Sequence, residues 1–122
     1  MPCRSIAIVK IREQWSIAFG EPNSTADLWF SDRLDHWNFR EMPAGTVFGS
    51  RRPGSSAQLS VCNEQDQDVS SAIFALQDDN FVLRRSVVPA MLTLNIQIIR
   101  DDCLGYLMEE YPLPVDLLIH PS

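Results

Sequence analysis

His36 is the side chain in this sequence best suited to exchange a proton near neutral pH. It lies between Asp35 and Trp37, and Arg40 follows after Asn38 and Phe39. A nearby carboxylate raises the pKa of an imidazole, and an indole ring can form the wall of a pocket. These four residues are therefore one candidate site, that of a small enzyme or ligand-binding domain. The same pattern is also typical of a histidine on the polar face of a helix.

The cysteines lack the spacing of a metal site or of a disulfide framework, since Cys3, Cys62 and Cys103 lie far apart in the chain. The two acidic residues before Cys103 disfavour a thiolate nucleophile there. Motifs for phosphate binding, serine hydrolysis and zinc peptidase chemistry are missing from the sequence. We therefore expect no catalytic residue, metal or cofactor. The cysteine pattern favours a reducing, cytoplasmic location.

Acidic residues recur in segments with the composition of loops. With 10 Lys and Arg against 16 Asp and Glu, the net charge is −6. If these loops gather at one sheet edge, their negative surface attracts a basic protein; otherwise they only solvate the loops. The candidate partner-binding carboxylates are Glu64, Asp66, Asp68, Asp78, Asp79, Asp101 and Asp102.

Aromatic residues are dense between positions 29 and 48, where Trp29 and Phe39 could lie outside the core stripe of an amphipathic helix. Exposed aromatic side chains are enriched at protein interfaces, although core packing also explains them. We interpret the chain as a non-enzymatic intracellular protein-binding module. An inhibitor, an immunity-type protein or an adaptor that binds a basic protein fits this interpretation, and homodimerisation is a companion expectation.

Nucleic acids and membranes are disfavoured as partners. RNA binding through Arg51, Arg52, Arg84 and Arg85 would work against the acidic net charge. The apolar runs are much shorter than the roughly 20 residues that a membrane-spanning helix requires. We therefore expect a protein partner in an aqueous compartment.

The length of 122 residues predicts a single domain, 1–122, with an exposed flexible loop around residues 50–57. We predict an α+β fold in which two to three helices cover one face of an antiparallel sheet of about five to six strands. A hairpin over residues 81–100 is central to this sheet. A mostly-β sandwich or barrel is the alternative.

Enrichment in Ile and Val predicts a strand at residues 5–12, and hydrophobic alternation predicts strands at 14–20 and 58–62, the first two joined tightly near Glu13. It also predicts the two arms of the hairpin, residues 81–88 and 92–100. Helical spacing predicts helices over residues 26–41, 69–79 and 101–111, the first with a Ser24–Asp27 capping box. Short strands at residues 28–30 and 71–77, the latter turning through 78–80, remain open as alternatives. The apolar tail, residues 115–119, is expected to dock on the core or on another chain.

Overall fold

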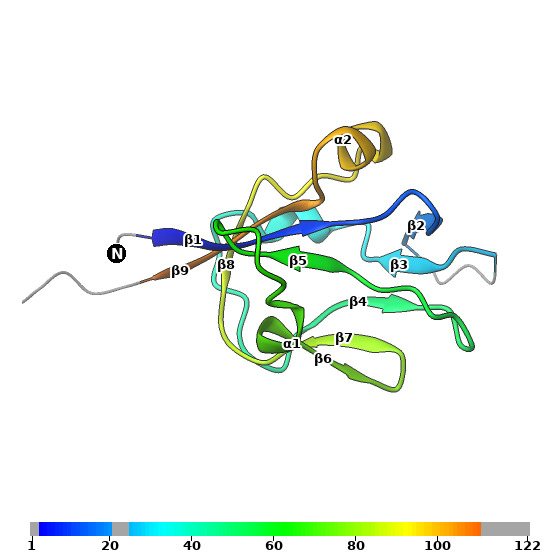
Figure 1. The fold of residues 1–122 in the computed structure, drawn as a ribbon, viewed down its shortest axis with the longest axis horizontal. Helices are drawn as coiled ribbons and strands as arrows, with labels where there is room; N and C mark the ends of the chain where they lie inside the picture. The colour runs from blue at the N-terminus through cyan, green and yellow to red at the C-terminus, as the bar shows by residue number, and fades with distance from the viewer. Residues whose placement is uncertain (1–2, 21–24, 111–122) are drawn as a thin grey trace, which may run out of the picture.

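The described part of the chain is mostly β, with 40% of its residues in strands and 13% in helices. The computed structural model describes residues 3–20 and 25–110, and it contains one sheet of four strands and one of five. The predicted α+β architecture, with two to three helices on a single sheet, is therefore wrong. Figure 1 shows the strands as the main framework, with short helices at its margins.

The four-stranded sheet joins segments from both ends of the described chain. Its central strands pair antiparallel in a long register that runs from Cys3 opposite Glu110 to Val9 opposite Gly105. The remaining two strands pair antiparallel on the outer sides of this central pair. In spatial order the strands are β5 (Ser60–Cys62), β1 (Cys3–Lys10), β9 (Gly105–Glu110) and β8 (Val88–Ala90).

The five-stranded sheet is antiparallel except at one edge, where β2 and β3 run parallel. Its first strand follows β1 in sequence but pairs in this other sheet, so the predicted tight hairpin near Glu13 is wrong. In spatial order the strands are β2 (Ile17–Phe19), β3 (Leu28–Phe30), β4 (Val47–Arg51), β7 (Asn80–Leu83) and β6 (Phe74–Gln77).

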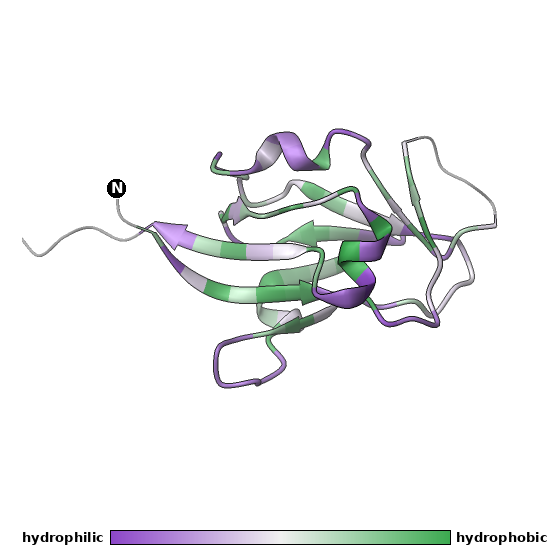
Figure 2. Cartoon of the chain, turned by 90° about the horizontal axis from the view of Figure 1, so that it is seen from above, coloured by the Kyte–Doolittle hydropathy of each residue, from purple (hydrophilic) through white to green (hydrophobic). Residues whose placement is uncertain are grey.

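Side chains from both sheets form one buried cluster. Val9 and Leu107 of the first sheet belong to it together with Phe30, Phe48 and Leu83 of the second. Phe48 links the aromatic part of this cluster, since its ring centroid lies 6.1 Å from that of Phe30 and 5.1 Å from that of Phe74. Figure 2 shows hydrophobic residues along the strands and hydrophilic residues along much of the connecting chain. The two sheets of the described chain therefore share this core.

The predicted hairpin over residues 81–100 is wrong, because only residues 81–83 of its first arm belong to β7, Val88 begins a strand of the other sheet, and its second arm is not a strand. Residues 92–95 are irregular, and the helix α2 (Ile96–Asp101) follows. Asn95 caps this helix, because its side chain accepts a hydrogen bond from the Ile98 backbone N–H at 3.2 Å. The true partner of β7 in a hairpin is β6, and the turn between them runs through Asp78 and Asp79. The alternative strand prediction for residues 71–77 is thus right for its second half.

Two predicted helices are also replaced by other structure. Residues 28–30 form β3, as the alternative prediction had it, and only a short 3-10 helix, η1 (Leu34–Trp37), follows. Residues 105–110 form β9 instead of a helix. The predicted helix over 69–79 shrinks to one turn, α1 (Ser70–Ile73). Ser24 of the predicted capping box and the apolar tail at 115–119 lie outside the described residues.

The predicted loop around residues 50–57 is exposed only in part. Pro53, Gly54 and Ser56 are exposed, whereas Ser55 and Ala57 are buried. The Ser55 hydroxyl accepts a hydrogen bond from the Ala57 N–H at 3.1 Å. This segment therefore contributes to the core between its exposed tips. The strand predictions for 5–12 and 58–62 correspond to β1 and β5.

Candidate functional site

The acidic segments do not gather at one edge of a sheet. Residues 63–68 follow β5, Asp78 and Asp79 form the β6–β7 turn, and Asp101 and Asp102 end α2. Figure 1 shows these three places in separate parts of the molecule. The structure therefore does not assemble the predicted carboxylates into one negative surface.

Several carboxylates bind partners within the chain. Asp79 forms an ion pair with Arg51, with 3.0 Å between Oδ1 and Nε. Asp101 accepts hydrogen bonds from the Gln97 side chain, and Asp68 accepts them from Ser70. The Ser70 bonds lower the pKa of Asp68. Glu64, Asp66, Asp78 and Asp102 are exposed.

The four residues of the alternative ligand site lie close in sequence but do not line one cavity. Asp35 and His36 belong to η1 and are exposed, with 4.0 Å between Asp35 Oδ1 and His36 Nε2. Arg40 is also exposed, whereas Trp37 is half-buried against the core. Trp37 lines a cavity of about 190 Å³ whose walls include neither Asp35, His36 nor Arg40. The arrangement provides no enclosed general base.

The two predicted interface aromatics differ in exposure. Trp29 is half-buried in β3, between the buried Leu28 and Phe30. Phe39 is 73% exposed. Met91, which the sequence had not indicated, is 68% exposed. Phe39 and Met91 are the most exposed of the large hydrophobic side chains in the described chain.

Phe39 and Met91 lie on neighbouring backbone segments that polar contacts hold together. The Asn38 side chain accepts a hydrogen bond from Leu92 N–H at 2.7 Å and donates one to the Leu92 carbonyl at 3.0 Å. The Phe39 N–H donates to the Pro89 carbonyl at 2.7 Å. These three bonds hold the two segments side by side, and we call the pair of exposed apolar residues that they carry the Phe39–Met91 patch.

The backbone at both residues of this patch is strained. Phe39 has a φ of 64° and Met91 a φ of 60°. A side chain with a Cβ avoids this left-handed region, and for a bulky residue such a φ is a genuine outlier. Strained residues persist where the surrounding structure over-determines them, and they cluster at functional sites. Here the strain accompanies the exposure of apolar side chains to solvent.

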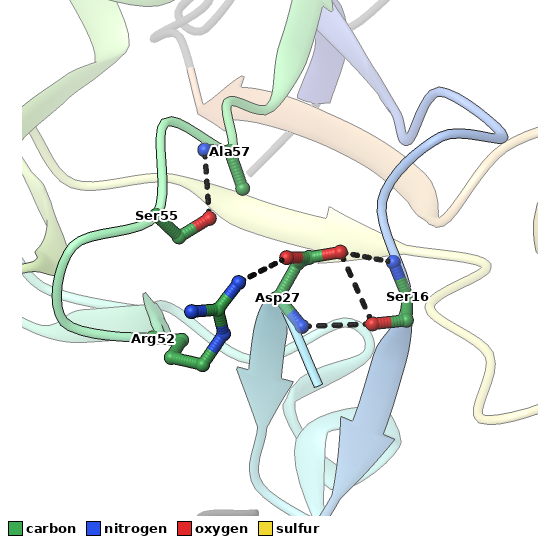
Figure 3. Close-up of polar contacts among 5 residues, drawn as sticks. All are labelled: Ser16, Asp27, Arg52, Ser55 and Ala57. Carbon is green, nitrogen blue, oxygen red and sulfur yellow. Dashed lines mark hydrogen bonds and ion pairs between the residues drawn. The ribbon is translucent and has the colours of Figure 1, made fainter. Parts of the chain in front are cut away.

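A second polar cluster joins β2, β3 and the segment after β4 (Figure 3). Asp27 accepts hydrogen bonds from Ser16 N–H at 2.9 Å, from Ser16 Oγ at 3.1 Å and from Arg52 Nη2 at 3.0 Å. The Ser16 N–H is the main cause of a lowered pKa of Asp27, and Arg52 adds to it. The Asp27 N–H in turn donates to Ser16 Oγ. No described base contacts this hydroxyl other than Asp27, so the cluster fastens strands together instead of activating a nucleophile.

The described residues also provide limited chemistry elsewhere. They contain no group of three His, Cys, Asp or Glu side chains arranged to hold a metal ion. Cys103 is buried, and desolvation is the main cause of the raised pKa of its thiol, which disfavours the reactive thiolate. A cavity of about 510 Å³ is lined by Arg12, Asp66 and Asp68 among others, so part of the acidic loop does border a hollow.

Asn38 and Met91 are the site residues that sequence reasoning missed. An asparagine beside an aromatic residue carries no distinctive pattern, and its partner Leu92 lies 54 residues away. One available signal was Pro89-Ala90-Met91, the segment between the two predicted arms of the 81–100 hairpin. None of the described helices is long and apolar enough to cross a membrane. Comparison of the chain with protein-family models, with curated proteins and with solved structures gives no match.

Proposed function

We propose that this chain is a non-enzymatic, cytoplasmic protein-binding module that uses the Phe39–Met91 patch as its anchor. The observation that carries the proposal is the exposure of two large apolar side chains on strained backbone. Aromatic side chains and Met are enriched in protein interfaces, where burial of their apolar surface drives association. An inhibitor, an immunity-type protein or an adaptor would all use such an anchor.

Electrostatics favour a basic partner. The chain has a net charge of −6, and the internal pairs of Arg51 with Asp79 and of Arg52 with Asp27 leave that excess of negative charge unchanged. The resulting field accelerates encounter with a positively charged protein and weakens as salt is added. The thiols of Cys62 and Cys103, which form no disulfide, support a reducing compartment.

Site-specific photo-cross-linking tests this function directly. A benzophenone amino acid replaces Phe39 in one variant and Ser56, an exposed residue of another loop, in a control variant. Irradiation in lysate of the source cells should join a defined protein to the position-39 variant but not to the position-56 variant. The yield should fall at high salt. Equal cross-linking from both positions, or none from position 39 at low salt, would refute the proposal.

A further inference from the structure

The strand β6 forms an open edge of the five-stranded sheet. Arg51 N–H donates to the Asp79 carbonyl, and Leu83 N–H donates to the Thr46 carbonyl. The backbone N–H and C=O groups of the odd-numbered residues of β7 therefore point toward β4. Arg84 N–H bonds to the Ile73 carbonyl, so even-numbered residues on this side face β6. By the antiparallel alternation, the backbone groups of Ala75 and Gln77 point toward β7, and those of Phe74 and Leu76 point away from the sheet.

Phe74 already uses its outward groups within the chain. Its N–H donates to the Ser70 carbonyl, which closes α1, and its carbonyl accepts from Arg84 Nε at 3.2 Å. The structure gives Leu76 no backbone partner on that side among residues 3–20 and 25–110. One outward N–H and one outward C=O therefore remain for another strand.

The side chain of Leu76 lies on the core face of this edge, because it pairs across the hairpin with the buried Phe81. It is nevertheless 42% exposed. A groove of about 270 Å³ runs beside it, and Leu59, Phe74 and Phe81 supply apolar parts of its lining. The edge thus combines unused backbone groups with apolar surface.

Opposite charges flank this edge. At one end of the edge, Arg84 Nε donates a hydrogen bond to the Phe74 carbonyl. At the other end lies the exposed Asp78, in the turn after Gln77. In an antiparallel pairing of two copies of β6 about a two-fold axis at Leu76, Asp78 of one copy lies opposite Phe74 of the other. Each Asp78 carboxylate then meets the Arg84 guanidinium of the other copy, and the symmetry repeats the ion pair.

We propose that a second copy of this chain binds at the β6 edge, in this two-fold antiparallel register centred on Leu76. The two Leu76 residues exchange two backbone hydrogen bonds, and their side chains cover each other over the apolar groove. Only a four-residue strand on each copy pairs, which is far fewer than the 20–30 residues a side of a standard interface, so association is weak and depends on concentration. This inference does not rest on the Phe39–Met91 patch.

Sedimentation velocity over a concentration series tests the dimer, with Asp78→Asn as the main variant. Asparagine keeps the left-handed turn conformation, for which Asp78 has a φ of 50°. The matched control is Asp66→Asn, because Asp66 is also exposed and has a φ of 60°. Loss of two exposed ion pairs should weaken dimerisation about 2-fold to 30-fold in Asp78→Asn and leave Asp66→Asn like the wild type.

Hydrogen exchange at the Leu76 amide gives an independent readout. This amide should exchange rapidly in dilute protein and become protected as concentration rises, because it gains a partner only in the dimer. Leu76→Pro, which removes the outward N–H without removing a bond to β7, should abolish dimerisation. A monomer at every concentration, equal effects of the two Asn variants, or no concentration dependence at the Leu76 amide would overturn the proposal.

Discussion

Replacing Phe39 with glycine should leave the stability of the protein nearly unchanged, although it removes a large aromatic side chain. Glycine adopts a φ of 64° without steric cost, so the variant releases the strain of the left-handed conformation. The hydrogen bond from the residue-39 N–H to Pro89 involves only backbone atoms and is retained. The change in the free energy of unfolding thus depends on whether the relief of backbone strain at residue 39 outweighs the loss of the buried part of the Phe39 side chain.

Three terms set the magnitude. Relief of the left-handed conformation stabilises the variant by about 1 to 2 kcal/mol. Only about a quarter of the Phe39 side chain is buried, so its loss costs about 0.4 to 0.8 kcal/mol. The greater freedom of glycine in the unfolded chain costs a further 0.5 to 1 kcal/mol, roughly. The variant should therefore lie within about 1 kcal/mol of wild type.

Urea unfolding followed by circular dichroism measures this difference, with Val47→Gly as the control. Val47 is 51% exposed and its φ is not positive, so its replacement should cost about 1.3 to 2.5 kcal/mol, with no strain to relieve. The smaller side chain should thus give the larger loss. If Phe39→Gly destabilises the protein more than Val47→Gly does, the residue is not strained as we argue.

Two further predictions concern polar contacts. The pKa of Asp27 is lowered, so its ionised carboxylate stabilises the fold at pH values above the ordinary pKa of 3.8. This stabilisation disappears as the pH falls through the lower pKa of the folded protein. The stability difference between wild type and Asp27→Asn, measured by urea unfolding, should be present at about pH 6 and shrink toward about pH 2; a constant difference would contradict it. Asn95→Ala should cost about 1 kcal/mol in thermal unfolding, because α2 loses its cap. An unchanged melting temperature would show that this cap contributes nothing.

Local patterns predicted two of the strands, one from its enrichment in Ile and Val and one from its alternation of apolar and polar residues. Residues 5–12 and 58–62 correspond to β1 and β5, where buried Val9 and Val61 lie in direct register. The pattern failed at 92–100 because Leu92 is buried, whereas Ile96 and Ile98 are about half-exposed on a short helix. The apolar and polar residues of 92–100 do alternate, but they belong to an irregular segment followed by a capped helix. The same spacing of apolar residues is therefore compatible with a strand or with this structure.

The error at 101–111 has a different cause. Leu104 and Leu107 have helical spacing, but both are buried in the strand region and Gly105 between them is also buried. A Cβ on Gly105 would lie 2.6 Å from the Leu92 side chain and 3.1 Å from its Cα. This glycine is therefore required by a close approach between two segments, which a single sequence does not reveal.

The candidate site was the least predictable part. Phe39 was named as a candidate anchor, but its exposure depends on Asn38 reaching Leu92 and on the Pro89 carbonyl, all contacts between distant segments. The acidic loops were identified as exposed segments, yet their separation follows from strand order. Strand order depends on pairing between segments distant in sequence. For example, β2 follows β1 in the chain but pairs in the other sheet.

The pairing of β1 with β9 has a kinetic consequence. The Arg4–Glu109 contact closes a separation of 105 residues, so the central pair of the four-stranded sheet cannot form until nearly all of the described chain has been synthesised. At about 5 to 20 residues per second, β1 waits roughly 5 to 20 s on the ribosome without its main partner. Sheets built from such distant contacts fold slowly, on a scale of milliseconds to seconds. The nascent chain is thus most exposed to misassembly through β1, and chaperone protection of that strand should matter more to yield than to the stability of the finished protein.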